Sequence, residues 1–265
     1  MTGGRLSGIG VRSATLLLFA ILLASLPVFA EDAETLFSQG LQVYGAENYE
    51  RAIQLFEQAA KAAPSVSRYE HWLGKAYGRR AERVIFIKAG GLAKKAKAAF
   101  ERAVELDPQN VGALTDLLDY YLSAPAILGG GEDKARGIAA RLAKISPAEG
   151  HRAQALLFAK RKEYAEAERE FRRASELEPA KLGRLLDLAC FLNERGRYDE
   201  ADALFDQAAK RDPKSPEYLF ARGRQLAVSK RNPERARELL EQYLRSPRGP
   251  DDPPPSEVQA LLKKL

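Results

Sequence analysis

The feature that most constrains this chain is a set of five positions that occurs three times with the same internal spacing, and the last two sets lie 34 residues apart. The positions hold Tyr, Ala, Phe, Ala and Pro. The three sets are Tyr49, Ala52, Phe56, Ala59 and Pro64; Tyr164, Ala167, Phe171, Ala174 and Pro179; and Tyr198, Ala201, Phe205, Ala208 and Pro213. A period of this length predicts a stacked array of similar units rather than one globular core.

The spacing within each set has a physical reason. Tyr, Ala, Phe and Ala lie at i, i+3, i+7 and i+10, which places them on one face of an α-helix. Small alanines let a neighbouring helix approach closely, and the aromatic rings fill the space beside them. The proline ends the helix because it has no N–H to donate. A single unit cannot bury this face, so each unit is expected to pack on the next.

The repeated pattern resembles the tetratricopeptide repeat, a helix–turn–helix unit of 34 residues. Leu73, Gly74 and Tyr77 match the first-helix part of its signature, whereas Glu70 stands where that family usually has tryptophan. The resemblance covers about residues 33–247. It implies an all-α fold, a right-handed α-solenoid of about six repeats whose first helices line a concave groove.

The second repeat carries an insertion. Gly74 and Ala96 are 22 positions apart, against 12 for Gly40 and Ala52, so ten residues are extra. We expect the first helix to continue through residues 84–87. The pair Gly90-Gly91 would then form the turn, and residues 92–106 would return as a helix.

The third repeat, residues 111–147, is also longer than the period. Tyr121 and Ala135 are 14 positions apart, against nine for Val43 and Ala52, and the five extra residues fall in the Pro- and Gly-containing stretch 123–131. This composition predicts a loop. Insertions at corresponding turns should project from the same edge of the array, where they often mark a binding face.

The two ends of the chain differ from the array. Arg5 and Arg12 precede an apolar run over residues 14–26, and Val28 and Ala30 are small residues at the positions that signal peptidase reads. Residues 1–30 are therefore predicted to be a signal peptide cleaved after Ala30, which makes the mature protein periplasmic or secreted. Retention of this segment as a membrane anchor stays open.

The predicted solenoid occupies residues 31–247, followed at 248–265 by a proline-rich connector and a capping helix over 257–264. Ser256 is expected to cap that helix. Val258, Leu261 and Leu262 are expected to cover the exposed stripe of the last repeat.

No catalytic, cofactor or metal site is predicted. The sequence lacks a Gly-x-Ser-x-Gly motif, a Walker motif and a dinucleotide fingerprint. His71 and His151 fall in different repeats without metal-ligand spacing. Cys190 is the only cysteine, and no nearby Lys, Arg or His in the sequence suggests a lowered thiol pKa. The chain is therefore not expected to be an enzyme.

The resemblance implies a partner-binding groove lined by first-helix residues. The candidate residues are Phe37, Tyr44, Arg68, His71, Lys75, Arg79, Arg152, Phe220 and Arg224. Aromatic anchors at the ends and a basic centre would suit a protein or peptide with an acidic or amphipathic segment. The alternative is that the repeat array is only a spacer, and that the charged residues of the groove are simply solvated. Family members that clamp a terminal carboxylate use Lys and Asn where this chain has Phe37 and Leu41, so that specificity is not expected.

A second functional hypothesis rests on the basic insertion 79–97. Its basic residues, which flank the apolar stretch 84–87, are Arg79, Arg80, Arg83, Lys88, Lys94, Lys95 and Lys97. Such a segment could contact an anionic membrane or polymer surface, or its apolar side could pack on the third repeat. Without Arg5 and Arg12 the net charge is 40 − 36 = +4, and no nucleic-acid-binding motif is present.

Overall fold

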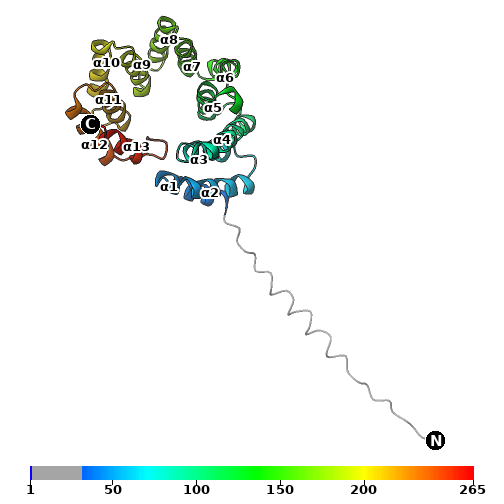
Figure 1. Ribbon diagram of the computed structural model, residues 1–265. Helices are drawn as coiled ribbons and strands as arrows, with labels where there is room; N and C mark the ends of the chain where they lie inside the picture. The colour runs from blue at the N-terminus through cyan, green and yellow to red at the C-terminus, as the bar shows by residue number, and fades with distance from the viewer. Residues whose placement is uncertain (2–31) are drawn as a thin grey trace. The chain divides into compact units, whose positions relative to one another are not determined.

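The computed structural model describes residue 1 and residues 32–265, of which Ala33–Leu265 form one compact unit. The predicted signal peptide lies outside the described residues. The unit consists of α-helices and one short 3-10 helix (Figure 1). The α-helices are α1 (Ala33–Gly45), α2 (Tyr49–Ala62), α3 (Ser67–Ala81), α4 (Phe86–Leu106), α5 (Val111–Ser123), α6 (Glu132–Ile145), α7 (Pro147–Lys160), α8 (Tyr164–Leu177), α9 (Leu182–Glu194), α10 (Tyr198–Arg211), α11 (Pro216–Val228), α12 (Pro233–Arg245) and α13 (Pro255–Leu262). The 3-10 helix η1 (Ala126–Leu128) lies between α5 and α6.

Successive helices pack as antiparallel pairs, from α1 with α2 to α11 with α12, and each pair packs on the next. Polar caps fix several of the starts. Asn232 accepts a hydrogen bond from the N–H of Arg235 at 3.0 Å, and Pro233 occupies the first position of α12, where its missing N–H costs nothing. The predicted all-α solenoid of six helix pairs is confirmed.

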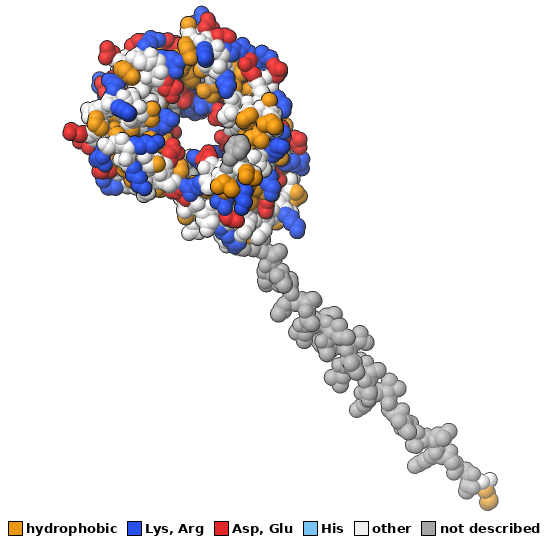
Figure 2. Space-filling view, in the orientation of Figure 1, with side chains coloured by type: hydrophobic (Ala, Val, Ile, Leu, Met, Phe, Trp, Pro, Cys, Tyr) orange, Lys and Arg blue, Asp and Glu red, His pale blue; other side chains and the backbone are white. Residues whose placement is uncertain are grey.

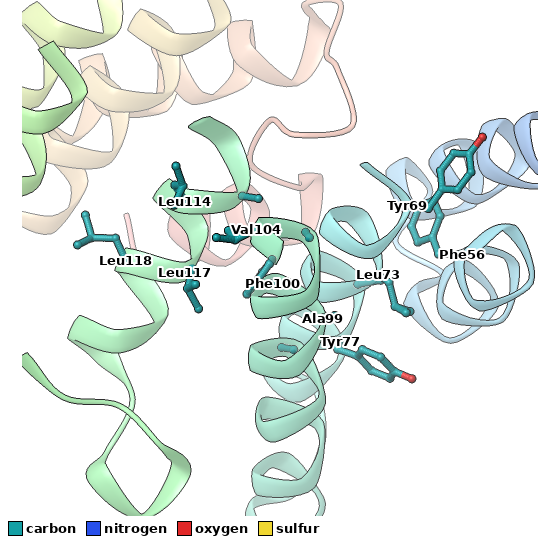
Figure 3. Close-up of a cluster of buried hydrophobic side chains, with 14 of the residues drawn as sticks. Phe56, Tyr69, Leu73, Tyr77, Ala99, Phe100, Val104, Leu114, Leu117 and Leu118 are labelled. Atoms are coloured by element: carbon teal, nitrogen blue, oxygen red, sulfur yellow. The ribbon is translucent and has the colours of Figure 1, made fainter. Parts of the chain in front are cut away.

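The recurring positions form the contacts within the pairs. Ala52, Ala59, Ala201 and Ala208 are fully buried. A Cβ atom added to Gly40 would lie 2.4 Å from a ring carbon of Phe56, so the absence of a side chain there is what lets α1 and α2 pack this closely. Figure 3 shows the same core continuing through α3, α4 and α5.

The insertion in the second repeat is folded differently from the prediction. α3 ends at Ala81, and the turn lies at residues 82–85, before Gly90 and Gly91, which are inside α4. Neither glycine has a positive φ. Arg83, in this turn, makes ionic and hydrogen-bond contacts with Glu47 of the preceding repeat. A Cβ atom added to Gly90 would make an ordinary contact with Leu128 at 3.6 Å, so packing does not require glycine at this position.

The insertion in the third repeat contains η1 and a glycine loop, as the composition predicted. Gly129 and Gly131 have φ values of 87° and 151°, which favour glycine. The hydroxyl of Tyr120 donates to the carbonyl of Leu128 at 2.8 Å and holds the loop against α5. η1 packs against α4, so the two insertions contact each other.

The C-terminal helix covers the last repeat, which confirms the predicted cap. α13 packs on α11 and α12, with Val258 fully buried. Ser256, however, does not cap it: α13 starts at Pro255 and the Ser256 hydroxyl donates to Glu47 of the first repeat. Ala33–Leu265 therefore bends into a ring in which α13 lies near α1 and α3 (Figure 1). No helix of residues 32–265 has the length and apolar character needed to cross a membrane.

Candidate partner-binding surface

One face of α3 carries three of the predicted site residues. His71, Lys75 and Arg79 are spaced by four residues and so lie along one side of the helix. The carboxylate of Asp116, on α5, lies 2.7 Å from His71 Nε2 and 3.1 Å from Lys75 Nζ. The structure therefore brings the predicted basic centre together and adds an acidic partner that the sequence argument had not singled out.

The charges on this face stabilise one another. Burial alone would raise the pKa of Asp116, but the hydrogen bond from His71 and the charge of Lys75 outweigh it and hold that pKa below its ordinary value. Burial likewise lowers the pKa of Lys75, whereas Asp116 and Asp251 outweigh this effect and raise it. Both groups are consequently ionised near neutral pH.

A cavity of about 430 Å³ opens beside this face. Its lining residues are Tyr44, Lys75, Gly78, Arg79, Glu82, Phe100, Asp116, Asp119, Tyr120, Ser123 and Asp251. The side chain of Asp119 has an exposed surface. The protein atoms around it remove part of its hydration, which raises its pKa to about 6.

Two of the predicted aromatic anchors are not exposed. Phe37 and Tyr44 each retain only 5% of their accessible surface. The ring centroids of Tyr69 and Phe37 are 4.9 Å apart, and those of Trp72 and Tyr44 are 5.3 Å apart. The prediction of their exposure is wrong because α3 covers the face of α1 that carries both rings. Tyr44 contributes to the site only at the edge of the cavity, where burial raises its pKa to about 12.

Arg68 and Arg152 are engaged in ion pairs. Arg68 is exposed and pairs with Glu34. Arg152 donates to Asp187 at 3.2 Å. Arg152 and Asp187 help to line a second cavity of about 340 Å³, between α5, α7 and α9, which the sequence did not predict.

Phe220 and Arg224, on α11, lie apart from the residues that line the α3 cavity. Both side chains are half-buried, and the ring centroids of Phe220 and Tyr243 are 5.5 Å apart. The nine candidates thus divide into a basic cluster on α3 and isolated positions elsewhere on the ring. Figure 2 shows that basic and acidic side chains both border the central opening.

The C-terminal connector and the first turn of α13 supply site residues that were not predicted from the sequence. Asp251 Oδ1 lies 2.6 Å from Lys75 Nζ, and Glu257 Oε2 lies 3.9 Å from Arg79 Nη1. A cavity of about 410 Å³ separates residues 248–255 from α1 and the start of α2. The only sequence signal for these residues was composition. An acidic, proline-rich stretch follows the repeats and does not show their spacing.

Comparison with known families agrees with this architecture. Two family models, each described as tetratricopeptide repeat, match residues 158–223 and residues 89–110. The chain contains tetratricopeptide repeats. The second match falls on α4, in the repeat that carries the ten-residue insertion.

Solved structures resemble most of the chain. A thermophilic TPR protein of Thermus thermophilus is 24% identical, with a TM-score of 0.57, over 75% of this chain and 99% of that one. PilF of Pseudomonas aeruginosa is 17% identical, with a TM-score of 0.50, over 86% and 96%. Yeast Tom70 is 16% identical, with a TM-score of 0.52, over 82% and 45%. At these identities the likeness concerns the fold. No curated protein matches the sequence.

Tetratricopeptide repeats generally serve as scaffolds that bind proteins or peptides, and neither matching model describes a catalytic domain. Within the described part of the chain, no group of three or more His, Cys, Asp or Glu side chains could hold a metal ion. Burial raises the pKa of Cys190 to about 11, which suits a structural thiol on α9.

Proposed function

We propose that this protein is an exported scaffold that binds an acidic segment of a protein partner at the basic face of α3. Export rests on the predicted signal peptide, residues 1–30, and would place the scaffold in the periplasm or outside the cell. The observation that carries the proposal is the cavity of about 430 Å³ beside Lys75 and Arg79. Lys75 and Arg79 already pair with carboxylates there, Lys75 with Asp116 and Asp251 and Arg79 with Glu82. A carboxylate of a partner would exchange with one of these contacts.

Arg79 provides the sharpest test of binding at this face. Its side chain is 30% exposed and borders the cavity, so Arg79→Ala should remove a contact without opening the core. Arg102→Ala is the matched control, because Arg102 on α4 pairs with its neighbour Glu105, outside the cavity. The probe is a fluorescent extended peptide rich in Asp and Glu, titrated by anisotropy.

We expect Arg79→Ala to weaken peptide binding at least about fivefold, the loss typical of one charge-assisted contact. Arg102→Ala should leave binding unchanged. Equal loss in both variants would indicate attraction by net charge alone and would contradict the proposal. In cells, a photo-crosslinker at Ser123, which lines the cavity, should capture a partner whose yield falls with Arg79→Ala.

A second candidate function is contact with an anionic membrane surface through the two insertions. Ile85, Ile87 and Ile127 are 68%, 87% and 84% exposed, and the segments that carry them contact each other through α4 and η1. Lys88 and Lys94 are also exposed on α4. Exposed isoleucines beside lysines are suited to the interface of an anionic bilayer.

Flotation with phosphatidylserine-containing vesicles tests this second candidate. Ile87→Asp combined with Ile127→Asp should abolish flotation, because charged side chains would replace the apolar tip. Val228→Asp is the control, since Val228 is 60% exposed on α11, at a different place on the array. Unchanged flotation of the double variant would exclude the isoleucine tip as a membrane contact.

A further inference from the structure

The two ends of the repeat array are joined by contacts between residues far apart in sequence. Glu47, in the turn after α1, accepts hydrogen bonds from the N–H of Ser256 at 3.0 Å and from the Ser256 hydroxyl. Arg83 donates to the Ser256 hydroxyl at 2.6 Å and pairs with Glu47. These contacts join residues 209 and 173 positions apart.

Acidic side chains of the same C-terminal segment lie on the basic face of α3. Lys75 pairs with Asp251 and Arg79 with Glu257, on either side of the Ser256 contacts. We refer to residues 248–257 as the C-terminal latch. The latch thus places two carboxylates on the surface where we propose that a partner's acidic segment binds.

The backbone of the latch is suited to reversible docking. Pro254 has φ −70° and ψ 151°, the polyproline II conformation, and the latch contains prolines at 250, 253, 254 and 255. Residues 249–252 form a turn closed by hydrogen bonds between Gly249 and Asp252. A segment restricted by this turn and by four prolines loses little conformational entropy when it docks. Its carbonyl at Pro253 accepts a hydrogen bond of 2.5 Å from the buried Tyr243, which anchors the latch to the last repeat.

The ion pairs between the latch and α3 are exposed on the latch side, whereas Lys75 and Arg79 are only 18% and 30% exposed. The side chains of Asp251 and Glu257 retain 58% and 40% of their accessible surface. Exposed ion pairs contribute little to stability and are screened by salt. The packing of Val258 on α11 and α12, by contrast, is fully buried. The weak part of the closure is therefore the latch-to-α3 contact, and α13 can stay on its repeat when the ring opens.

We propose that the C-terminal latch is a built-in ligand of the α3 face, and that an acidic, proline-containing segment of a partner binds there by displacing it. This inference rests on the proposed function for the identity of the site. It adds that the site is occupied in the free protein, and that opening of the ring controls access to it.

Ring opening can be measured in the full chain without any partner. In a Cys190→Ser background, spin labels at Gln58→Cys on α2 and Gln259→Cys on α13 report the distance across the closure, since both positions are exposed. The latch variant is Asp251→Asn with Glu257→Gln. Its control, Asp206→Asn with Glu241→Gln, removes the same charges from positions on α10 and α12, two helices that do not pack on α3.

We expect one narrow distance distribution in the unmodified chain and in the control, and a broader, longer one in the latch variant. A fluorescent peptide with the sequence of residues 248–257 should bind the latch variant at least about tenfold more tightly than the unmodified chain. The reason is that the latch of the variant competes less well with the peptide for the α3 face. An unchanged distance distribution in the latch variant would overturn the proposal. So would failure of the peptide to discriminate between the two proteins.

The distance measurement separates this proposal from the proposed function. If the latch variant opens and the latch peptide binds, but no other acidic peptide does, the latch is real and the α3 face serves the chain's own end alone. If Asp- and Glu-rich peptides bind while the distance never changes, the α3 face is a binding site without a latch.

Discussion

At the scale of single residues, two glycines set how closely paired helices approach. A Cβ added to Gly40 or Gly74 would lie 2.4 Å from Phe56 or 2.5 Å from Phe100, distances that require the ring to move. Both phenylalanines are buried, so neither ring has free space to move into. Each glycine is thus required by packing rather than by backbone conformation.

Gly40→Ala should therefore lower the free energy of unfolding by about 1–3 kcal/mol, the usual cost of overpacking a core. Gly137→Ala is the matched control: Gly137 lies inside α6, and an added Cβ would meet nothing within 4 Å. That change should raise stability by about 0.5–1 kcal/mol, because alanine loses less entropy in a helix. Urea denaturation measures both. Stabilisation by Gly40→Ala would show that α1 and α2 do not pack as described.

The thiol of Cys190 gives a second prediction at this scale. Because burial raises its pKa to about 11, only about one thiol in a thousand is ionised at pH 8, and the thiolate is the reactive form. Iodoacetamide should label Cys190 at least about tenfold more slowly in the folded protein than in urea, as followed by mass spectrometry. Equal rates would mean that the thiol is exposed and unperturbed.

At the scale of helices, the sequence predicted the pairs well because its period reports contacts between neighbours. Ala201 and Phe205 recur from earlier repeats, and both are fully buried where α9 meets α10. The turn in the second repeat was predicted wrongly, at Gly90-Gly91 rather than at residues 82–85. Glycine composition is a local signal, whereas this turn contacts the preceding repeat through Arg83 and Glu47, which local composition does not report.

Ala201→Phe tests the register of the pairs. The larger ring has no space at a fully buried position, so the free energy of unfolding should fall by about 1–3 kcal/mol. Ala203→Phe, on the exposed side of the same helix α10, is the control and should change stability by less than about 0.5 kcal/mol. A melting temperature that fell equally in both variants would argue against the assigned core face.

At the scale of the whole repeat array, closure into a ring could not be predicted from the period. The contacts that close it, such as Lys75 with Asp251, join a repeat to a segment outside the repeats, and no spacing rule relates the two. The candidate site was predicted in part for a similar reason. His71, Lys75 and Arg79 were found because they share one helix face, whereas Asp116 and Asp251 come from other elements.

We expect Glu47 to make ring closure dependent on pH. Burial alone would raise its pKa, but the hydrogen bonds from Ser256 and Arg83 outweigh this and hold the pKa below its ordinary value of 4.5. In an open ring the contact with Ser256 is lost and the pKa returns toward that value. A carboxyl whose pKa is lower in the closed form binds protons more tightly in the open form. The contribution of Glu47 to closure is therefore complete above pH 4.5. It disappears as the pH falls through the lowered pKa of Glu47 in the closed ring.

We expect the spin-label distance between positions 58 and 259 to stay short from about pH 7 to about pH 5 and to lengthen below about pH 4. Circular dichroism on the same samples should show that the helices remain, which separates opening from unfolding. In Glu47→Gln the neutral side chain keeps a hydrogen-bond acceptor but cannot titrate, so the distance should depend less on pH. If Glu47→Gln and the unmodified chain open over the same pH range and to the same extent, Glu47 does not control the closure, and the contact with Ser256 is incidental to it.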